Sequence, residues 1–305
     1  MIFKVIKDRE ECAQLWKKLS TPECWWDEWE VRECFLTEGH NKLYFLVGYE
    51  NEEVVGVLPL CFNEEKDRYE SLGGGFPEYE KFLLKDKTKI GLFFDQGPGK
   101  IWIDCIDKRE KDFFPLKKSY SNYYLDLVKI QTLENYLLTF SKKHRRNLLA
   151  DIKKISADGY KIQTSDTDST LLEALEKYNK ERFGEDSSFC EKGFKESLEN
   201  IIRLAKKEGI LQMISIRKET QIVAALIAVL YKGTYICILS GSDPKISNLG
   251  KLLIYTYIEN AFHLKAKKID FLGGQSTWKK LWNLETEELY EFTKNVFFPS
   301  DPNLE

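Results

Sequence analysis

A lysine and an aspartate in the last third of the chain are placed where side chains can take part in chemistry. Asp270 lies inside the apolar run 269–272, and Lys279 follows the glycine pair 273–274 that ends this run. A bare carboxylate in an apolar strand is costly, so Asp270 is predicted either to act as a general base for an amine or to pair with Lys279 or Arg146. The ammonium of Lys279 could stabilise an acyl carbonyl or a phosphate, or it could simply be solvated.

A second set of reactive groups lies on an apolar strand further upstream. Tyr235 and Ser240 flank this strand, and either hydroxyl could protonate a leaving thiolate. Cys237 lies between them among apolar neighbours, which predicts an inert thiol rather than a nucleophile.

The segment 241–264 has the layout of a phosphate-binding helix start. A glycine turn and a polar loop precede a long amphipathic run. Backbone N–H groups at such a start can hold a phosphate, assisted by the helix dipole. The alternative is an ordinary first turn of a helix. The residues concerned are Asn248, Leu249, Gly250, Lys251 and Leu252.

Four cations cluster in a helical pattern near the middle of the chain. They are Lys142, Lys143, Arg145 and Arg146, with His144 between them. The cluster could bind phosphate on a nucleotide-linked or CoA-linked substrate, although most charge runs are solvated helix faces. With a period of 3.6, Lys142 and Arg146 share one face. His144 could be a general base, or it could only pack.

Composition argues against several classes of protein. The 305 residues are 43% hydrophobic and 13% aromatic, which is typical of a packed globular protein. The net charge of −3 does not favour a protein that wraps nucleic acid. Seven cysteines without a C-x-x-C pair, together with three histidines, argue against a zinc site, so no metal is expected. No apolar run reaches the length of a membrane span, and we expect a soluble, cytoplasmic protein.

The elements that position these residues follow a regular order in the second half of the chain. The pattern predicts β, α, α, β, β, β, α, β, β, with consecutive strands at 211–217, 222–231 and 234–239. This order predicts an α/β or α+β domain with a mixed, mainly antiparallel sheet flanked by helices. A closing strand is expected at 286–298.

The first half has a looser version of the same order. It contains a strand at 2–6, a helix at 9–19 and a hairpin of 43–47 with 54–60. Two tandem domains of related fold are therefore predicted. The expected boundaries are an N-terminal domain at 1–128, a basic helical linker at 129–159 and a C-terminal domain at 160–305.

Several of these segments resemble the GNAT acyltransferase superfamily, in particular its two-domain CelD/BioF2-like, Fem-related branch. The basic helix 141–148 is similar to the helix that joins the two domains of this branch. The segment 222–230 is similar to a strand rich in small residues in the same proteins. The segments 250–253, 270–274 and 278–282 are similar to the motifs G-x-L-L, D-F-x-x-G and Y-K-x-x-W. One departure is that Lys251-Leu252 replace the second glycine of the phosphate loop of single-domain enzymes.

The resemblance implies an N-acyltransferase with two tandem GNAT-like domains, the first of them degenerate. It would move an acetyl or other acyl group from acyl-CoA to an amine of a sugar, amino acid or peptide by direct attack. The implied catalytic residues are Lys279, Asp270 and Tyr235. The segment 248–252 would bind acetyl-CoA or another acyl-CoA. The implied substrate-binding residues are Lys142, Arg145, Arg146 and Trp278.

Two alternatives to this function stay open. One is a Fem-like peptidyltransferase that uses aminoacyl-tRNA, although the helical arm that many such enzymes carry is not seen in the sequence. The other is a GNAT-like binding module without catalysis, which the incomplete glycine motif would fit. A tRNA partner is expected only under the first alternative, and no DNA partner is expected.

Overall fold

The computed structural model describes residues 1–164, 167–274 and 277–296, and the chain folds as two compact units. The first unit contains Met1–Ser121, Lys195–Ile201 and the end of the chain from Glu288, and the second contains Asn122–Phe194 and Ile202–Glu287. The stretch 129–159, which the sequence suggests as a linker, lies inside the second unit. Among the described residues, none of the helices has the length and apolar content that a membrane crossing would need.

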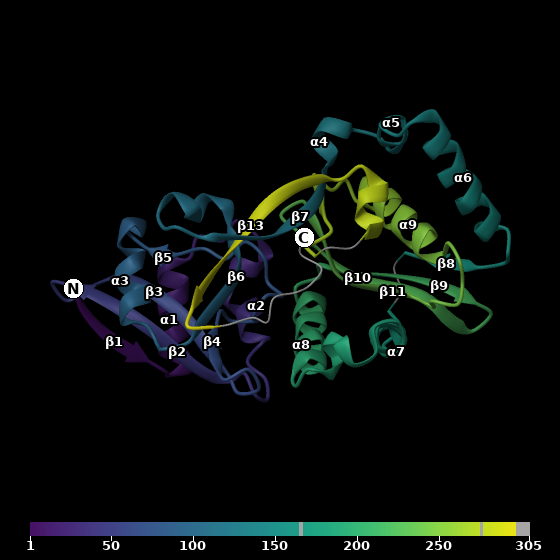
Figure 1. Ribbon diagram of the computed structural model, residues 1–305. Helices are drawn as coiled ribbons and strands as arrows, with labels where there is room; N and C mark the ends of the chain where they lie inside the picture. The colour runs from purple at the N-terminus through teal and green to yellow at the C-terminus, as the bar shows by residue number, and fades with distance from the viewer. Residues whose placement is uncertain (165–166, 275–276, 297–305) are drawn as a thin grey trace. The chain divides into compact units, whose positions relative to one another are not determined.

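The first unit is built on a mainly antiparallel sheet with the order β1-β2-β3-β4-β6-β13, in which β5 also pairs with β3 (Figure 1). The predicted hairpin is confirmed, because β2 and β3 pair in antiparallel register with Leu46 opposite Leu58. The strands are β1 (Ile2–Ile6), β2 (Lys42–Glu50), β3 (Glu53–Asn63), β4 (Arg68–Glu70), β5 (Leu83–Leu84), β6 (Ile101–Asp107) and β13 (Glu285–Lys294). The closing strand thus ends at Lys294, and positions 297–298 of the prediction lie outside the described residues.

Short helices complete the first unit. Helix α1 begins after Asp8, whose side chain accepts a hydrogen bond from Glu11 N at 3.0 Å, and it buries Cys12 and Trp16 one turn apart. The helices are α1 (Arg9–Leu19), η1 (Trp25–Asp27), α2 (Trp29–Glu33), η2 (Lys87–Lys89), α3 (Ile90–Gln96) and η3 (Lys108–Asp112). The sequence pattern did not predict α3, which lies in a glycine-punctuated region.

The second unit is built on a mixed sheet with the order β7-β12-β11-β10-β9-β8. Only β11 and β12 run parallel, and the other neighbouring pairs are antiparallel, as the sequence pattern predicts. The strands are β7 (Lys117–Asp126), β8 (Lys161–Gln163), β9 (Leu211–Lys218), β10 (Gln221–Tyr231), β11 (Thr234–Ser242) and β12 (Lys268–Asp270).

Helices cover both faces of this sheet. In Figure 1, α9 and α6 lie on one side of it and α7 lies on the other. Helix α9 packs on β10 and β11 and buries Leu252 and Tyr257, and α6 packs on α9. The helices are α4 (Leu127–Ile130), α5 (Leu133–Leu138), α6 (Lys142–Ser156), α7 (Leu171–Phe183), η4 (Gly184–Asp186), η5 (Ser188–Cys190), α8 (Phe194–Lys207, of which Lys195–Ile201 belong to the first unit), α9 (Leu249–His263) and η6 (Thr277–Trp282).

Candidate active site

The two parallel strands of the second unit separate after three residue pairs. Thr234–Ile236 of β11 pair with Lys268–Asp270 of β12, and β11 then continues to Ser242 without this neighbour. The chain after β12 stays instead with β7, because Phe271 N donates to Tyr123 O at 2.8 Å. A β-bulge at Ile238, between the pairs Ala228–Cys237 and Ile227–Leu239, turns β11 further. The carboxyl ends of both strands therefore border an open space.

A cavity of about 470 Å³ occupies this space. It is lined by the end of β11, the start of α9, the last turns of α7, Phe271 and Leu272 after β12, and η6. This is the size of a small-molecule site, and ligands of open α/β sheets bind at the carboxyl ends of parallel strands.

The start of α9 forms one side of the cavity. Asn248 has a left-handed backbone conformation with φ of +65°, and its carbonyl oxygen accepts hydrogen bonds from Lys251 N at 3.0 Å and Leu252 N at 3.2 Å. The first N–H groups of a helix lack intrahelical acceptors and attract anions. Asn248, Gly250 and Lys251 line the cavity, whereas Leu249 and Leu252 are buried in the core. Three of the five residues predicted for donor binding thus reach the cavity.

Lys279 also lines the cavity and is only 4% exposed. Its ammonium donates to the carbonyl oxygen of Leu272 at 2.7 Å and to that of Gly273. It also lies 5.0 Å from the ring centre of Tyr123 and 5.9 Å from that of Trp278. Carbonyl oxygens and aromatic faces together can hold a cation with little water. Trp278 lines the same cavity.

Asp270 does not line the cavity, although the sequence suggests it as a base. Its Oδ1 accepts hydrogen bonds from Asn122 Nδ2 at 2.7 Å and from Leu272 N at 2.9 Å, and Lys268 Nζ lies 3.8 Å from its other oxygen. Leu272 has a φ of +56°, which is strained for a residue with a side chain. Asp270 therefore stabilises the turn whose carbonyl groups hold Lys279.

Tyr235 is also placed away from the cavity. Its side chain is fully buried between β11 and α9, where its hydroxyl accepts a hydrogen bond from Asn260 Nδ2 at 3.1 Å. Burial raises the pKa of Tyr235 well above its usual range. The hydroxyl of Tyr257 donates to the Tyr235 carbonyl at 2.9 Å. These contacts give Tyr235 a place in the core of the domain, and they do not bring its hydroxyl to the cavity.

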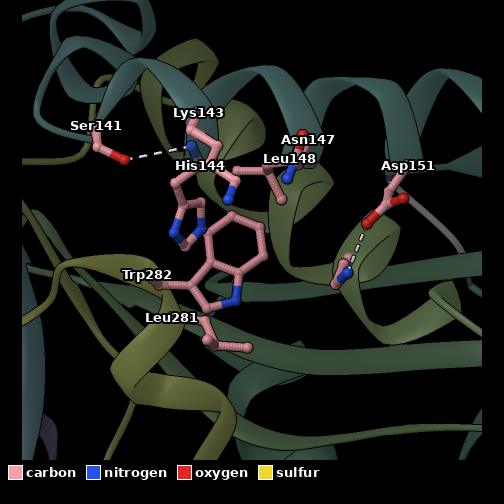
Figure 2. Close-up of a pocket in the computed structure, with 9 residues that line it drawn as sticks. Ser141, Lys143, His144, Asn147, Leu148, Asp151, Leu281 and Trp282 are labelled. Atoms are coloured by element: carbon pink, nitrogen blue, oxygen red, sulfur yellow. Dashed lines mark hydrogen bonds and ion pairs between the residues drawn. The ribbon is translucent and has the colours of Figure 1, made fainter.

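A second cavity, of about 350 Å³, lies between α6, α9 and η6 (Figure 2). Helix α6 turns Lys143, His144 and Asn147 toward this cavity. The substrate-binding residues suggested from the sequence, Lys142, Arg145 and Arg146, line neither of the two cavities.

The sequence alone did not single out the α7 side of the first cavity. Tyr178, Asn179, Arg182 and Phe183 line it there. One available signal in the sequence was Phe183, a large apolar residue that follows Arg182 at the end of the helix, and in the structure its side chain is 49% exposed. Cys237 also lines the cavity, and burial raises the pKa of its thiol to about 12, with the nearby Lys279 ammonium lowering it in part.

Comparison with known proteins identifies the class of this domain. Residues 142–280 match the family model described as an acetyltransferase (GNAT) domain. No curated protein sequence matches the chain.

Nearly the whole chain is similar in fold to several solved structures. FemX has 11% sequence identity and a TM-score of 0.56, over 95% of this chain and 97% of that one. A tandem GNAT protein from the clavulanic acid biosynthesis pathway has 10% identity and a TM-score of 0.57, over 98% and 99%. L-PGS from Bacillus licheniformis has 14% identity and a TM-score of 0.53, over 96% and 94%. Residues 142–280 thus match the model of a GNAT acetyltransferase domain, and nearly the whole chain is similar in fold to these solved structures, one of which is a tandem GNAT protein.

Proposed function

We propose that the protein is an N-acyltransferase that moves an acetyl or longer acyl group from acyl-CoA to an amine. One observation carries this proposal. The cavity between the ends of β11 and β12 is lined both by the start of helix α9 and by the buried cation Lys279. A phosphate-bearing thioester can place its phosphates at the start of α9 and its acyl carbonyl toward Lys279.

The chemistry follows from this placement. The amine attacks the thioester carbonyl, a C–N bond forms, the C–S bond breaks, and the amine proton leaves to water. Negative charge develops on the carbonyl oxygen, and the buried ammonium of Lys279 stabilises it. Ser240 lines the cavity on β11, and its hydroxyl can give a proton to the departing thiolate.

The test is a thiol-release assay with acetyl-CoA and amine acceptors from three groups: amino sugars, amino acids and short peptides. Turnover with any group, together with stoichiometric acetylated product by mass spectrometry, would support the proposal. If calorimetry at millimolar concentration detected no binding of acetyl-CoA, propionyl-CoA or a long-chain acyl-CoA, the proposal would be refuted.

The alternative with aminoacyl-tRNA as the donor rests on the similarity in fold to FemX over nearly the whole chain. The two proposals differ in the acyl donor, so the donor that supports turnover distinguishes them. Turnover of an aminoacyl-tRNA whose rate falls steeply with salt, without any turnover of CoA thioesters, would favour it.

A further inference from the structure

Helix α6 carries a concentration of positive charge that the two cavities do not account for. Its 15 residues contain six cations and one carboxylate, Asp151, and this carboxylate is paired with Lys251 at 2.6 Å. The chain as a whole has a net charge of −3. The helix is therefore a local positive region on a weakly acidic protein. In Figure 1, it lies at the periphery of the second unit.

Most of these cations lie on the side of α6 that faces away from the core. Leu148, Ile152 and Ile155 are buried in the core beneath the helix. At about 100° per residue, the opposite side forms an arc of about 120° that is about 18 Å long. The other residues of this arc, all of them described by the structure, are Ala150 and Ala157, so the arc holds no carboxylate and no aromatic ring. The exposed cations of the arc are Lys142, Lys143, Arg146, Lys153 and Lys154.

These five cations differ from the charges of a helix that is merely solvated. On α7, three carboxylates alternate with three cations, and Lys180 pairs with Glu176 at 2.7 Å. On α6, none of the five exposed cations forms an ion pair with any carboxylate that the structure describes. Like charges four residues apart, such as Lys142 and Arg146, destabilise a helix. An anionic partner would remove this repulsion, which solvent alone does not.

We propose that this face of α6 attaches the protein to the surface of an anionic lipid membrane. The inference is independent of the acyltransferase function proposed above. Each lysine or arginine near an anionic bilayer strengthens binding about fivefold, so five of them supply about 10³-fold. Such an attachment is peripheral and reversible, and it requires no helix that crosses the membrane.

Three features of the face favour lipid over nucleic acid. Four of the five cations are lysines, whereas fixed recognition of phosphates favours the planar fork of arginine. The arc has alanines where bases would need aromatic rings for stacking. Leu149 borders the arc and is 37% exposed, and Leu138 of the neighbouring helix α5 is 64% exposed. Apolar side chains beside lysines insert between lipid headgroups, and a nucleic-acid backbone offers them no partner.

The experiment measures sedimentation of the full chain with two kinds of vesicle. One is phosphatidylcholine alone, and the other is phosphatidylcholine and phosphatidylglycerol in equal parts. The variant that tests the face combines Lys142→Ala, Arg146→Ala and Lys153→Ala. The matched control removes three exposed cations from other elements of the same unit, so it makes the same change in net charge, by Lys206→Ala, Lys207→Ala and Lys245→Ala. Circular dichroism and thermal melts establish that each variant is folded.

We expect the wild type to bind the anionic vesicles and not the neutral ones, with an affinity that falls as salt is added. The α6 triple variant should bind about 10²-fold more weakly, and the control triple variant should stay close to the wild type. Equal losses in the two triple variants would overturn the inference, because only net charge would then matter. A wild type that does not bind the anionic vesicles would also overturn it.

A further variant and a further ligand separate lipid from nucleic acid. Leu149→Ser leaves the charge unchanged and should weaken binding to the anionic vesicles several-fold, since it removes apolar surface from the contact. Unchanged binding in this variant would overturn the lipid assignment in favour of polyanions in general. Binding of tRNA or duplex RNA that is lost in the α6 triple variant, without binding of the vesicles, would assign the face to nucleic acid and overturn the inference.

Discussion

The ammonium nitrogen of Lys279 lies 2.7 Å from the carbonyl oxygen of Leu272, so a backbone turn holds the buried cation of the cavity. Asp270 stabilises this turn by accepting a hydrogen bond from Leu272 N. Asp270 itself accepts a hydrogen bond from the side chain of Asn122. A series of contacts therefore runs from the interior of the sheet to the charged group at the cavity. The first two predictions test its two ends.

Replacing Lys279 with Met should lower kcat for acyl transfer by about 10² to 10³, the usual effect of removing one group that stabilises an oxyanion. KM for acetyl-CoA should change little, because the charge acts mainly in the transition state. Steady-state kinetics at saturating acceptor measure both. The matched control is Lys280→Met, since Lys280 is exposed. A Lys279→Met variant with full kcat would remove Lys279 from the mechanism.

Replacing Asp270 with Ala should destabilise the protein by about 3 kcal/mol, since Asn122 Nδ2 and Leu272 N would lose a buried charged acceptor. Urea unfolding measures this loss. Asp270→Asn keeps one acceptor oxygen and should cost less. If Asp270 were instead the general base, Asp270→Asn would abolish turnover and leave stability and the fold unchanged.

The outcome for Asp270 shows what the sequence could and could not predict. The carboxylate in an apolar strand correctly marks a group with buried partners, but the partner Asn122 lies 148 residues away along the chain. Element order and most strands followed from periodicity, because alternation and turn residues are local signals. The face of α6 that meets the cavity depends on packing against α9, so the pattern of cations could not decide between Lys142 and Lys143.

Replacing Lys251 with Met should raise KM for acetyl-CoA several-fold, because Lys251 lines both cavities. Stability should change by less than about 1 kcal/mol, since its ion pair with Asp151 is partly exposed. Kinetics and urea unfolding of the same sample measure the two effects. Lys245→Met is the control, because Lys245 has a side chain that is 80% exposed and does not line either cavity. Equal KM values in both variants would contradict the placement of the donor.

The thiol of Cys237 should react slowly with iodoacetamide in the native protein. Burial raises the pKa of Cys237 to about 12, so at pH 8 the thiolate fraction is about 10⁻⁴. Raising the pH toward the folded-state pKa should speed the reaction. Cys190 is exposed and serves as the internal control. Peptide mass spectrometry of timed samples measures both sites. Labelling of Cys237 as fast as Cys190 would point to an activated thiolate and a covalent route.

Glu23 should make stability depend on acid pH. Its carboxylate accepts from Arg109 Nη2 at 2.8 Å and from Lys81 Nζ at 3.0 Å, and these contacts lower the pKa of Glu23 to about 2. Because this folded-state pKa lies below the ordinary value of 4.5, the carboxylate stabilises the fold above about pH 4.5. The contribution is lost as the pH falls toward 2. The effect is modest, since the Glu23 side chain is half-exposed.

Urea unfolding of wild type and Glu23→Gln at pH 6 and pH 3 measures this dependence. The difference in the free energy of unfolding should be larger at pH 6 than at pH 3. A difference that is the same at both pH values would show that the ion pairs do not shift the titration of Glu23.

The bulge at Ile238 adds one residue to β11, so the side-chain alternation after it is opposite to the alternation before it. All six residues from Cys237 to Ser242 line the first cavity, although a strand normally presents every second residue to one side. Deleting Ile238 would bring the strand back into a single alternation and exchange the sides of Ser240 and Gly241, with no change in any other amino acid. When related sequences are aligned, a gap of one residue at this point would therefore indicate a different cavity lining. It would do so more clearly than several substitutions around it.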